Sequence, residues 1–239
     1  EGASITISEC TISSFANIKI KNSAVAVIYF TNNKRTSTEE LPAVNIEKTA
    51  VDSLIVKSSA HLYINDSAVV KKLIYSGSEK ESLGCEFGMF NSKIGNVFAE
   101  IQKNIRLVTI ENCKSLIQEE DARIHFNFSG SRIGKINIDN STLFGTTIGL
   151  DFVSVQAIII SNSVVGKGLL VRCSPLEKNK EINQIQLVEC IDSCFGKVKF
   201  DGREILNAAD FSGAVFENAP SFHNSTLPQG SGFPVKKNF

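Results

Sequence analysis

The sequence predicts an all-β protein, a parallel β-helix (solenoid) of about 8–10 irregular coils. A short phrase with alternating apolar residues recurs along the 239 residues, and most recurrences lie about two dozen residues apart. The segments between them show no helical periodicity. One coil cannot bury its own apolar face, but stacked coils bury it together. We therefore treat residues 1–239 as a single repeat domain.

The repeated phrase is clearest in "KINIDNSTL", residues 135–143, where alternate residues are apolar up to Asn140-Ser141 and Leu143 resumes the pattern. The small residue of the phrase recurs at ten positions, Cys10, Ser23, Thr49, Ser67, Ser92, Cys113, Ser141, Ser163, Cys190 and Ser225. Three positions earlier all ten residues are apolar, and five positions earlier nine are. Because alternate side chains of a strand share a face, these columns predict the walls of the core.

Each phrase ends in a predicted corner. Asn91, Asn112, Asn140 and Asn162 stand directly before the small residue in four consecutive instances. Asn tolerates left-handed backbone geometry, bonds to its own turn and can form a ladder of stacked amides. The predicted structural corner column is Asn91, Asn112, Asn140, Asn162, Cys113, Ser141, Ser163 and Cys190. A nucleophilic role for its two cysteines would require a neighbouring base, and the sequence places none there.

Two other architectures fit less well. A two-sheet β-sandwich would need hairpin turns between neighbouring strands, and the one Asp-Gly pair, at 201–202, comes late in the chain. A leucine-rich repeat would need a return segment with its own Leu and Asn signature, which the sequence lacks. Polar segments at 31–42, 76–84 and 174–184 are predicted to be loops that leave the coils.

The sequence resembles two known families. "VTIENCKSL", "INIDNSTL" and "IIISNSVV" are similar to the repeats of pectin-lyase-like proteins, and "AADFSGAVFENAPSFHNSTL" at 208–227 resembles the pentapeptide-repeat family. Both resemblances imply a right-handed parallel β-helix, and neither implies an activity. Residues 228–239 are expected to be a frayed tail. Since an uncovered coil invites pairing, we expect either a fragment of a longer protein or an end covered by a partner or second copy.

Composition narrows the function. The 25 basic and 25 acidic residues cancel, so no nucleic-acid partner is predicted, and no apolar run is long enough to cross a membrane. The six cysteines contain no C-x-x-C pair and the three histidines are isolated, so neither a metal nor another cofactor is predicted. Cysteines without a disulfide pattern favour a reducing compartment such as the cytoplasm.

Three functions remain as hypotheses. We favour a non-catalytic scaffold or protein-interaction module, with a protein partner or with self-association through a coil end. The alternative is a carbohydrate-active enzyme of the glycoside hydrolase or lyase type, in which Glu111 and Asp139 are stacked about 5 Å apart and Asp151 is a further candidate. The absence of Trp argues against this enzyme, since carbohydrate grooves usually contain aromatic platforms. The third hypothesis is a topoisomerase-binding role, which the pentapeptide resemblance implies because some members of that family have it. This role relies on an acidic surface, and the net charge of zero argues against it.

Overall fold

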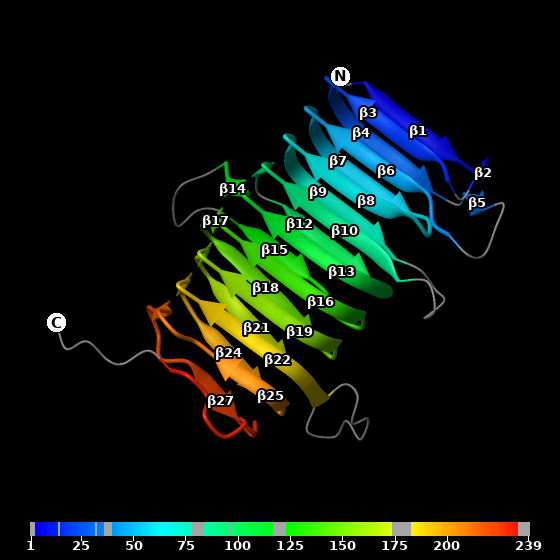
Figure 1. Ribbon diagram of the computed structural model, residues 1–239. Coiled ribbons are helices and arrows are strands. Elements are labelled where there is room, and N and C mark those ends of the chain that lie inside the picture. Colours follow the sequence, from blue (N-terminus) through cyan, green and yellow to red (C-terminus); the bar gives the residue numbers. More distant parts are fainter. Residues whose placement is uncertain are drawn as a thin grey trace.

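The computed structural model describes residues 3–13, 15–31, 33–35, 40–77, 84–95, 97–116, 123–173 and 183–233. These residues form parallel strands joined by turns and stacked as a β-solenoid of about eight turns. The coils follow one another in sequence order, so the two termini lie at opposite ends of the stack (Figure 1). The predicted fold class, an all-β parallel solenoid, is confirmed.

One wall of the solenoid is a nine-stranded parallel sheet to which each coil adds one strand. Its strands, in spatial order, are β3 (Asn17–Lys21), β6 (Ala43–Glu47), β8 (His61–Asn65), β10 (Cys85–Phe90), β13 (Asn104–Glu111), β16 (Arg132–Asp139), β19 (Ser154–Ser161), β22 (Gln184–Ile191) and β25 (Glu204–Asp210). Inward residues lie directly above one another, for example Ile110, Ile138 and Ile160. The alternation of buried and partly exposed residues along these strands matches the predicted columns.

The opposite wall belongs to a sixteen-stranded sheet that divides into two branches at β9. The undivided part contains β1 (Ser4–Ser8), β4 (Ala24–Thr31), β7 (Ala50–Lys57) and β9 (Ala68–Ser76). The long branch continues with β12 (Phe98–Gln102), β15 (Ile124–Asn127), β18 (Thr146–Asp151), β21 (Gly168–Arg172), β24 (Val198–Asp201) and β27 (Ser221–His223). Two-residue strands form the other branch, β11 (Lys93–Ile94), β14 (Lys114–Ser115), β17 (Thr142–Leu143), β20 (Val164–Val165), β23 (Cys194–Phe195) and β26 (Val215–Phe216). A separate pair, β2 (Thr11–Ile12) and β5 (Lys34–Arg35), lies near the first coil.

Aromatic side chains fill the last coils. Phe200 stacks on Phe222 with 5.4 Å between ring centroids, and Phe211 stacks on Phe233 at 5.3 Å. The chain continues past β27 and returns over β25, where Thr226 and Gly232 form parallel bridges with this strand. Part of the segment expected to fray, up to residue 233, therefore contacts the last coil, and residues 234–239 lie outside the described residues.

Candidate functional site

The corner column is a ladder of hydrogen bonds. Asn91, Asn112, Asn140 and Asn162 all have a left-handed backbone, with φ between 46° and 53°. The amide of Asn140 donates to Oδ1 of Asn112 in the preceding coil at 2.6 Å. The four Asn residues therefore supply the left-handed turn, and the side chains of Asn140 and Asn162 also bond to the preceding coil.

The small residues after the corner are also hydrogen-bonded from coil to coil. The backbone N–H of Ser141 donates to Oγ of Ser163, and that of Ser163 donates to Oγ of Ser193, both at 3.1 Å. Each hydroxyl also donates to the carbonyl two residues earlier in its own coil, as Ser163 does to Ser161 at 2.6 Å. Each serine hydroxyl therefore acts as both acceptor and donor inside a buried corner. The small size of these residues in the sequence did not indicate this hydrogen-bonding role.

Three residues of the alignment lie elsewhere. Cys190 is not in the corner column, because it pairs with Ile160 inside β22; Asp192, with φ of 48°, and Ser193 form that corner. The prediction for Cys190 was wrong by three residues. Cys10 follows β1 and Ser225 follows β27, so both lie at the other corner of the coil, after strands of the sixteen-stranded sheet.

Burial makes the corner cysteine unsuitable as a nucleophile. None of the six cysteines forms a disulfide. Burial raises the pKa of Cys113 to about 11, and it raises the pKa of Cys190 further. Thiols must ionise to act as nucleophiles, and these two resist ionisation at neutral pH.

Glu111 and Asp139 are neighbours in register on β13 and β16, as predicted. The hydrogen bonds of the Asp139 carboxylate, however, are made with the coil on the side away from Glu111. Oδ1 of Asp139 accepts from the Ser161 hydroxyl at 2.8 Å and from the Asn162 amide at 3.2 Å, both in the following coil. The structure thus directs Asp139 away from Glu111. Asp151 is on β18 in the other sheet, so it does not join this pair.

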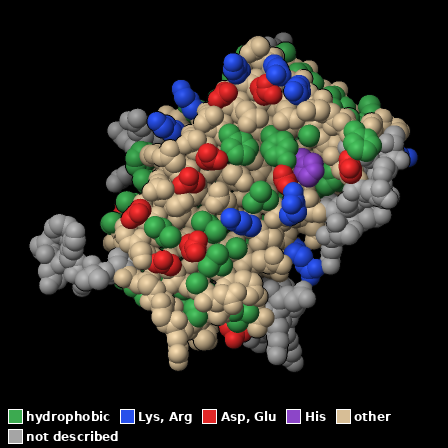
Figure 2. Space-filling model, viewed as in Figure 1, with side chains coloured by type: hydrophobic (Ala, Val, Ile, Leu, Met, Phe, Trp, Pro, Cys, Tyr) green, Lys and Arg blue, Asp and Glu red, His purple; other side chains and the backbone are tan. Residues whose placement is uncertain are grey.

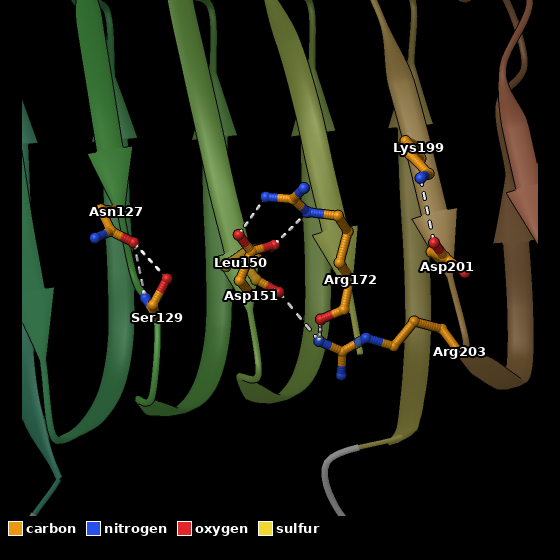
Figure 3. Close-up of polar contacts among 8 residues, drawn as sticks. All are labelled: Asn127, Ser129, Leu150, Asp151, Arg172, Lys199, Asp201 and Arg203. Carbon is orange, nitrogen blue, oxygen red and sulfur yellow. Dashed lines mark hydrogen bonds and ion pairs between the residues drawn. The ribbon is translucent and has the colours of Figure 1, made fainter. Parts of the chain in front are cut away.

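Asp151 belongs to a ladder of charges on the sixteen-stranded sheet (Figure 3). Arg172 donates to both of its carboxylate oxygens, from Nε at 2.7 Å and from Nη2 at 2.5 Å. Asp201 follows Arg172 in register and pairs with Lys199 at 3.2 Å. Each acid of this ladder therefore has a cationic partner, as in a structural pair.

The side chain of Arg203 lies inside the solenoid and is only 1% exposed. Its guanidinium donates to the backbone carbonyls of Val153, Leu150 and Arg172 at 2.9, 3.1 and 2.9 Å, two of which Figure 3 shows. Burial lowers the pKa of Arg203. This arginine links three coils from within, a role that the sequence did not indicate.

A polar network that the sequence did not reveal lies on the outer face of the nine-stranded sheet. Tyr63 donates its hydroxyl to Oε2 of Glu86, and Arg106 pairs with Oε1 of the same carboxylate. The backbone N–H of Glu86 donates to Nδ1 of His61 at 3.0 Å. Burial lowers the pKa of His61 and raises that of Tyr63, and the hydrogen bond to Glu86 raises the latter further. Both groups are therefore neutral at pH 7.

A groove with a volume of about 520 Å³ lies beside this network, where β13, β16, β19 and β22 begin. Arg106 belongs to both features, and Arg132, Gln156, Gln184 and Gln186 are the other long polar side chains of the lining. Among the residues that the structure describes, no group of three or more His, Cys, Asp or Glu side chains could hold a metal ion. The guanidinium and amide groups of the lining are suited to hydrogen bonds with polar ligands.

The chain matches no family model, and comparisons with curated proteins and with solved structures found no similar protein. The two family resemblances therefore remain predictions, while the solenoid fold stands on the structure itself. Within the described part of the chain, no helix has the length and apolar character needed to cross a membrane.

Proposed function

We propose that the chain is a non-catalytic β-solenoid module that binds a protein partner through the outer face of the nine-stranded sheet. The observation that carries the proposal is an apolar centre on this face. Ala157 and Leu187 are in-register neighbours on β19 and β22, and Ile159 lies one outward position further along β19. All three point outward and are only partly buried. Apolar side chains on an outer sheet face are typical of interaction surfaces.

Charges flank this apolar centre on two sides. Acidic side chains run along the left of the face in Figure 2, and basic side chains lie to the right in the middle of the view. Within the described residues, no Lys or Arg forms an ion pair with Glu111, Asp139, Glu189 or Asp192. A partner with an apolar centre and basic groups opposite these acids would be complementary, and such complementarity determines specificity and association rate.

The test compares two substitutions of the same kind on opposite faces. Ile159→Lys places a charge in the apolar centre, whereas Ile55→Lys places one at an outward, partly buried position of β7 in the other sheet. A photo-reactive side chain at Thr109 would identify a partner, which is then purified and titrated against each variant. We expect Ile159→Lys to abolish binding of the partner and Ile55→Lys to retain it. Circular dichroism should show that both variants are folded.

Equal binding by Ile159→Lys and the unmodified chain would contradict the proposal. Sedimentation of the chain alone distinguishes a different association, through a coil end. In that case the chain would self-associate at high concentration, and Ile159→Lys would leave this association unchanged.

A carbohydrate-active enzyme remains the second candidate because Glu111 and Asp139 are in register on adjacent strands. Adjacent strands are about 4.8 Å apart, and retaining glycosidases separate their carboxyl groups by about 5–5.5 Å. Incubation with a broad set of polysaccharides tests it. Cleavage that Glu111→Gln abolishes would support the enzyme, and no cleavage of any of them would remove it.

A further inference from the structure

A groove lies at the start of β13, β16, β19 and β22, beside the apolar centre proposed to bind a protein partner. Its volume of about 520 Å³ is in the range of pockets that bind small molecules. The lining consists of Gly84, Asn104, Ile105, Arg106, Arg132, Ile133, Gly134, Ser154, Val155, Gln156, Gln184 and Gln186. Among these described residues there are two cations, no acid and no aromatic side chain.

The two cations lie toward one end of the groove and the three amides toward the other. Arg106 and Arg132 belong to consecutive coils, on β13 and β16, whereas Gln156 is on β19 and Gln184 and Gln186 are on β22. Successive coils are about 4.8 Å apart. The lining therefore changes from guanidinium to amide groups within a distance that one small ligand can span. Guanidinium groups match carboxylate and phosphate oxygens in geometry and charge, and amides bond to hydroxyl groups.

The guanidinium of Arg106 is held in place before any ligand arrives. Glu86 accepts from its Nη2, and Glu86 is fixed in turn by the hydroxyl of Tyr63. A guanidinium has five N–H donors, so one bond to Glu86 leaves others for a ligand. Preorganised donors bind more tightly because less side-chain freedom is lost on binding.

The backbone forms part of the groove because glycine occupies two positions that approach Arg106. A Cβ on Gly134 would lie 2.5 Å from the carbonyl oxygen of Arg106, and one on Gly84 would lie 2.5 Å from its Cβ. Larger residues cannot occupy these positions without moving β13. The groove therefore stays open between its long polar side chains.

The amides keep hydrogen-bonding capacity for a ligand. Gln184 donates from Nε2 to Glu204 at 2.8 Å, and Oε1 of Gln186 accepts from Asn207 at 3.2 Å. Within the described residues, Oε1 of Gln184 and Nε2 of Gln186 have no hydrogen-bond partner, so one acceptor and one donor remain for a ligand. This pair suits a hydroxyl-bearing ligand, since a hydroxyl both donates and accepts.

We propose that this groove binds a small hydrophilic ligand that carries a carboxylate or phosphate group and several hydroxyls. Arg106 and Arg132 hold the oxyanion, and Gln156, Gln184 and Gln186 hold the hydroxylated body. An apolar or aromatic ligand is disfavoured, because none of the described lining residues is aromatic and the polar side chains would lose their hydration without new partners.

Titrations followed by amide NMR, with glucose 6-phosphate, gluconate and inorganic phosphate as probes, test this assignment. We expect saturable shifts in β13, β16 and β22 with at least one organic probe, and weaker binding of inorganic phosphate. The probe that binds shows whether the oxyanion is a phosphate or a carboxylate. Arg106→Gln and Arg132→Gln should each weaken binding about tenfold or more, since each removes charge-assisted hydrogen bonds.

Arg172→Gln is the matched control, because it removes an ion-paired arginine from the other sheet. It should leave the affinity unchanged, and circular dichroism should show all three variants folded. The absence of saturable shifts up to about 10 mM of each probe would overturn the proposal, as would an equal loss of affinity in Arg172→Gln. Inorganic phosphate binding as tightly as the organic probes would overturn the role of the amides.

Discussion

Removing the hydroxyl of Ser141 is expected to destabilise the solenoid more than its single oxygen suggests. Oγ of Ser141 accepts from the backbone N–H of Cys113 at 3.1 Å and donates to the carbonyl of Asp139 at 2.9 Å. The residue is 1% exposed, so water cannot replace either bond. Ser141→Ala thus leaves a buried donor without its acceptor and a carbonyl without one of its donors.

The magnitude follows from the cost of a buried group that loses its partner, about 1–3 kcal/mol. We expect Ser141→Ala to lower the free energy of unfolding by about 2 kcal/mol. Ser161→Ala is the control, because Ser161 is partly exposed and donates only to the carboxylate of Asp139. Water can take its place there, so the expected cost is below about 1 kcal/mol.

The reciprocal change is Cys113→Ser. Cys113 interrupts the row of hydroxyls, and the backbone N–H of Ser92 is directed at its sulfur. Because sulfur is a weak acceptor, a serine hydroxyl at this position should raise the free energy of unfolding by about 0.5–1 kcal/mol.

Urea unfolding followed by far-ultraviolet circular dichroism measures all three variants. The slope of free energy against urea shows whether each still unfolds cooperatively, which long repeat arrays need not do. Equal stability of Ser141→Ala and Ser161→Ala would refute the reasoning, since it would mean that the corner needs only a small residue. A loss of stability in Cys113→Ser would also refute the reasoning, since it would mean that a hydroxyl at this corner does not accept the hydrogen bond better than sulfur does.

Three further outcomes are expected. Arg203→Met should lower the free energy of unfolding by about 2 kcal/mol or more in urea titrations, because three buried carbonyls lose a donor. Gly134→Ala should lower it by about 1–3 kcal/mol, because the new Cβ would meet the carbonyl of Arg106 at 2.5 Å. Burial lowers the pKa of His61, so the unfolded chain binds a proton first as pH falls, and stability is lost below about pH 6.5. His61→Gln should make urea stability fall less between about pH 7.5 and 5.5, although His125, whose pKa burial also lowers, keeps part of the decrease.

The columns of the sequence predicted the walls of the solenoid because inward residues repeat with the period of a strand. Ile138 and Ile160 could be aligned by the alternation of their strands and by the Asn-Ser pair that follows each of them two residues later. The alignment assigned Cys10 and Ser225 to the wrong corner for a physical reason. Both corners of a coil require a left-handed residue followed by a residue that fits inside, so a sequence phrase does not say which corner it forms.

The site was less predictable than the fold. Register placed Glu111 beside Asp139, but the direction of the Asp139 carboxylate depends on Ser161 and Asn162 in the next coil. The network of Tyr63, Glu86 and Arg106 was missed because an irregular pairing at the start of β10 shifts its register against β13. Loops of different length between coils add to this, since they hide which polar residues become neighbours.

Hydrogen bonding decides where on this solenoid a ligand can be recognised. At the corners, Asn and Ser groups bond to the next coil, so a ligand would have to break bonds that hold the stack together. On the sixteen-stranded sheet, Asp151 and Asp201 are neutralised by Arg172 and Lys199. The outer face of the nine-stranded sheet differs, because its acids Glu111, Asp139 and Glu189 form no ion pair within the described residues. The strands of this sheet also begin at a groove lined by arginines and amides. Recognition through that face leaves the corner ladders between coils intact, which is why both proposals place a ligand there.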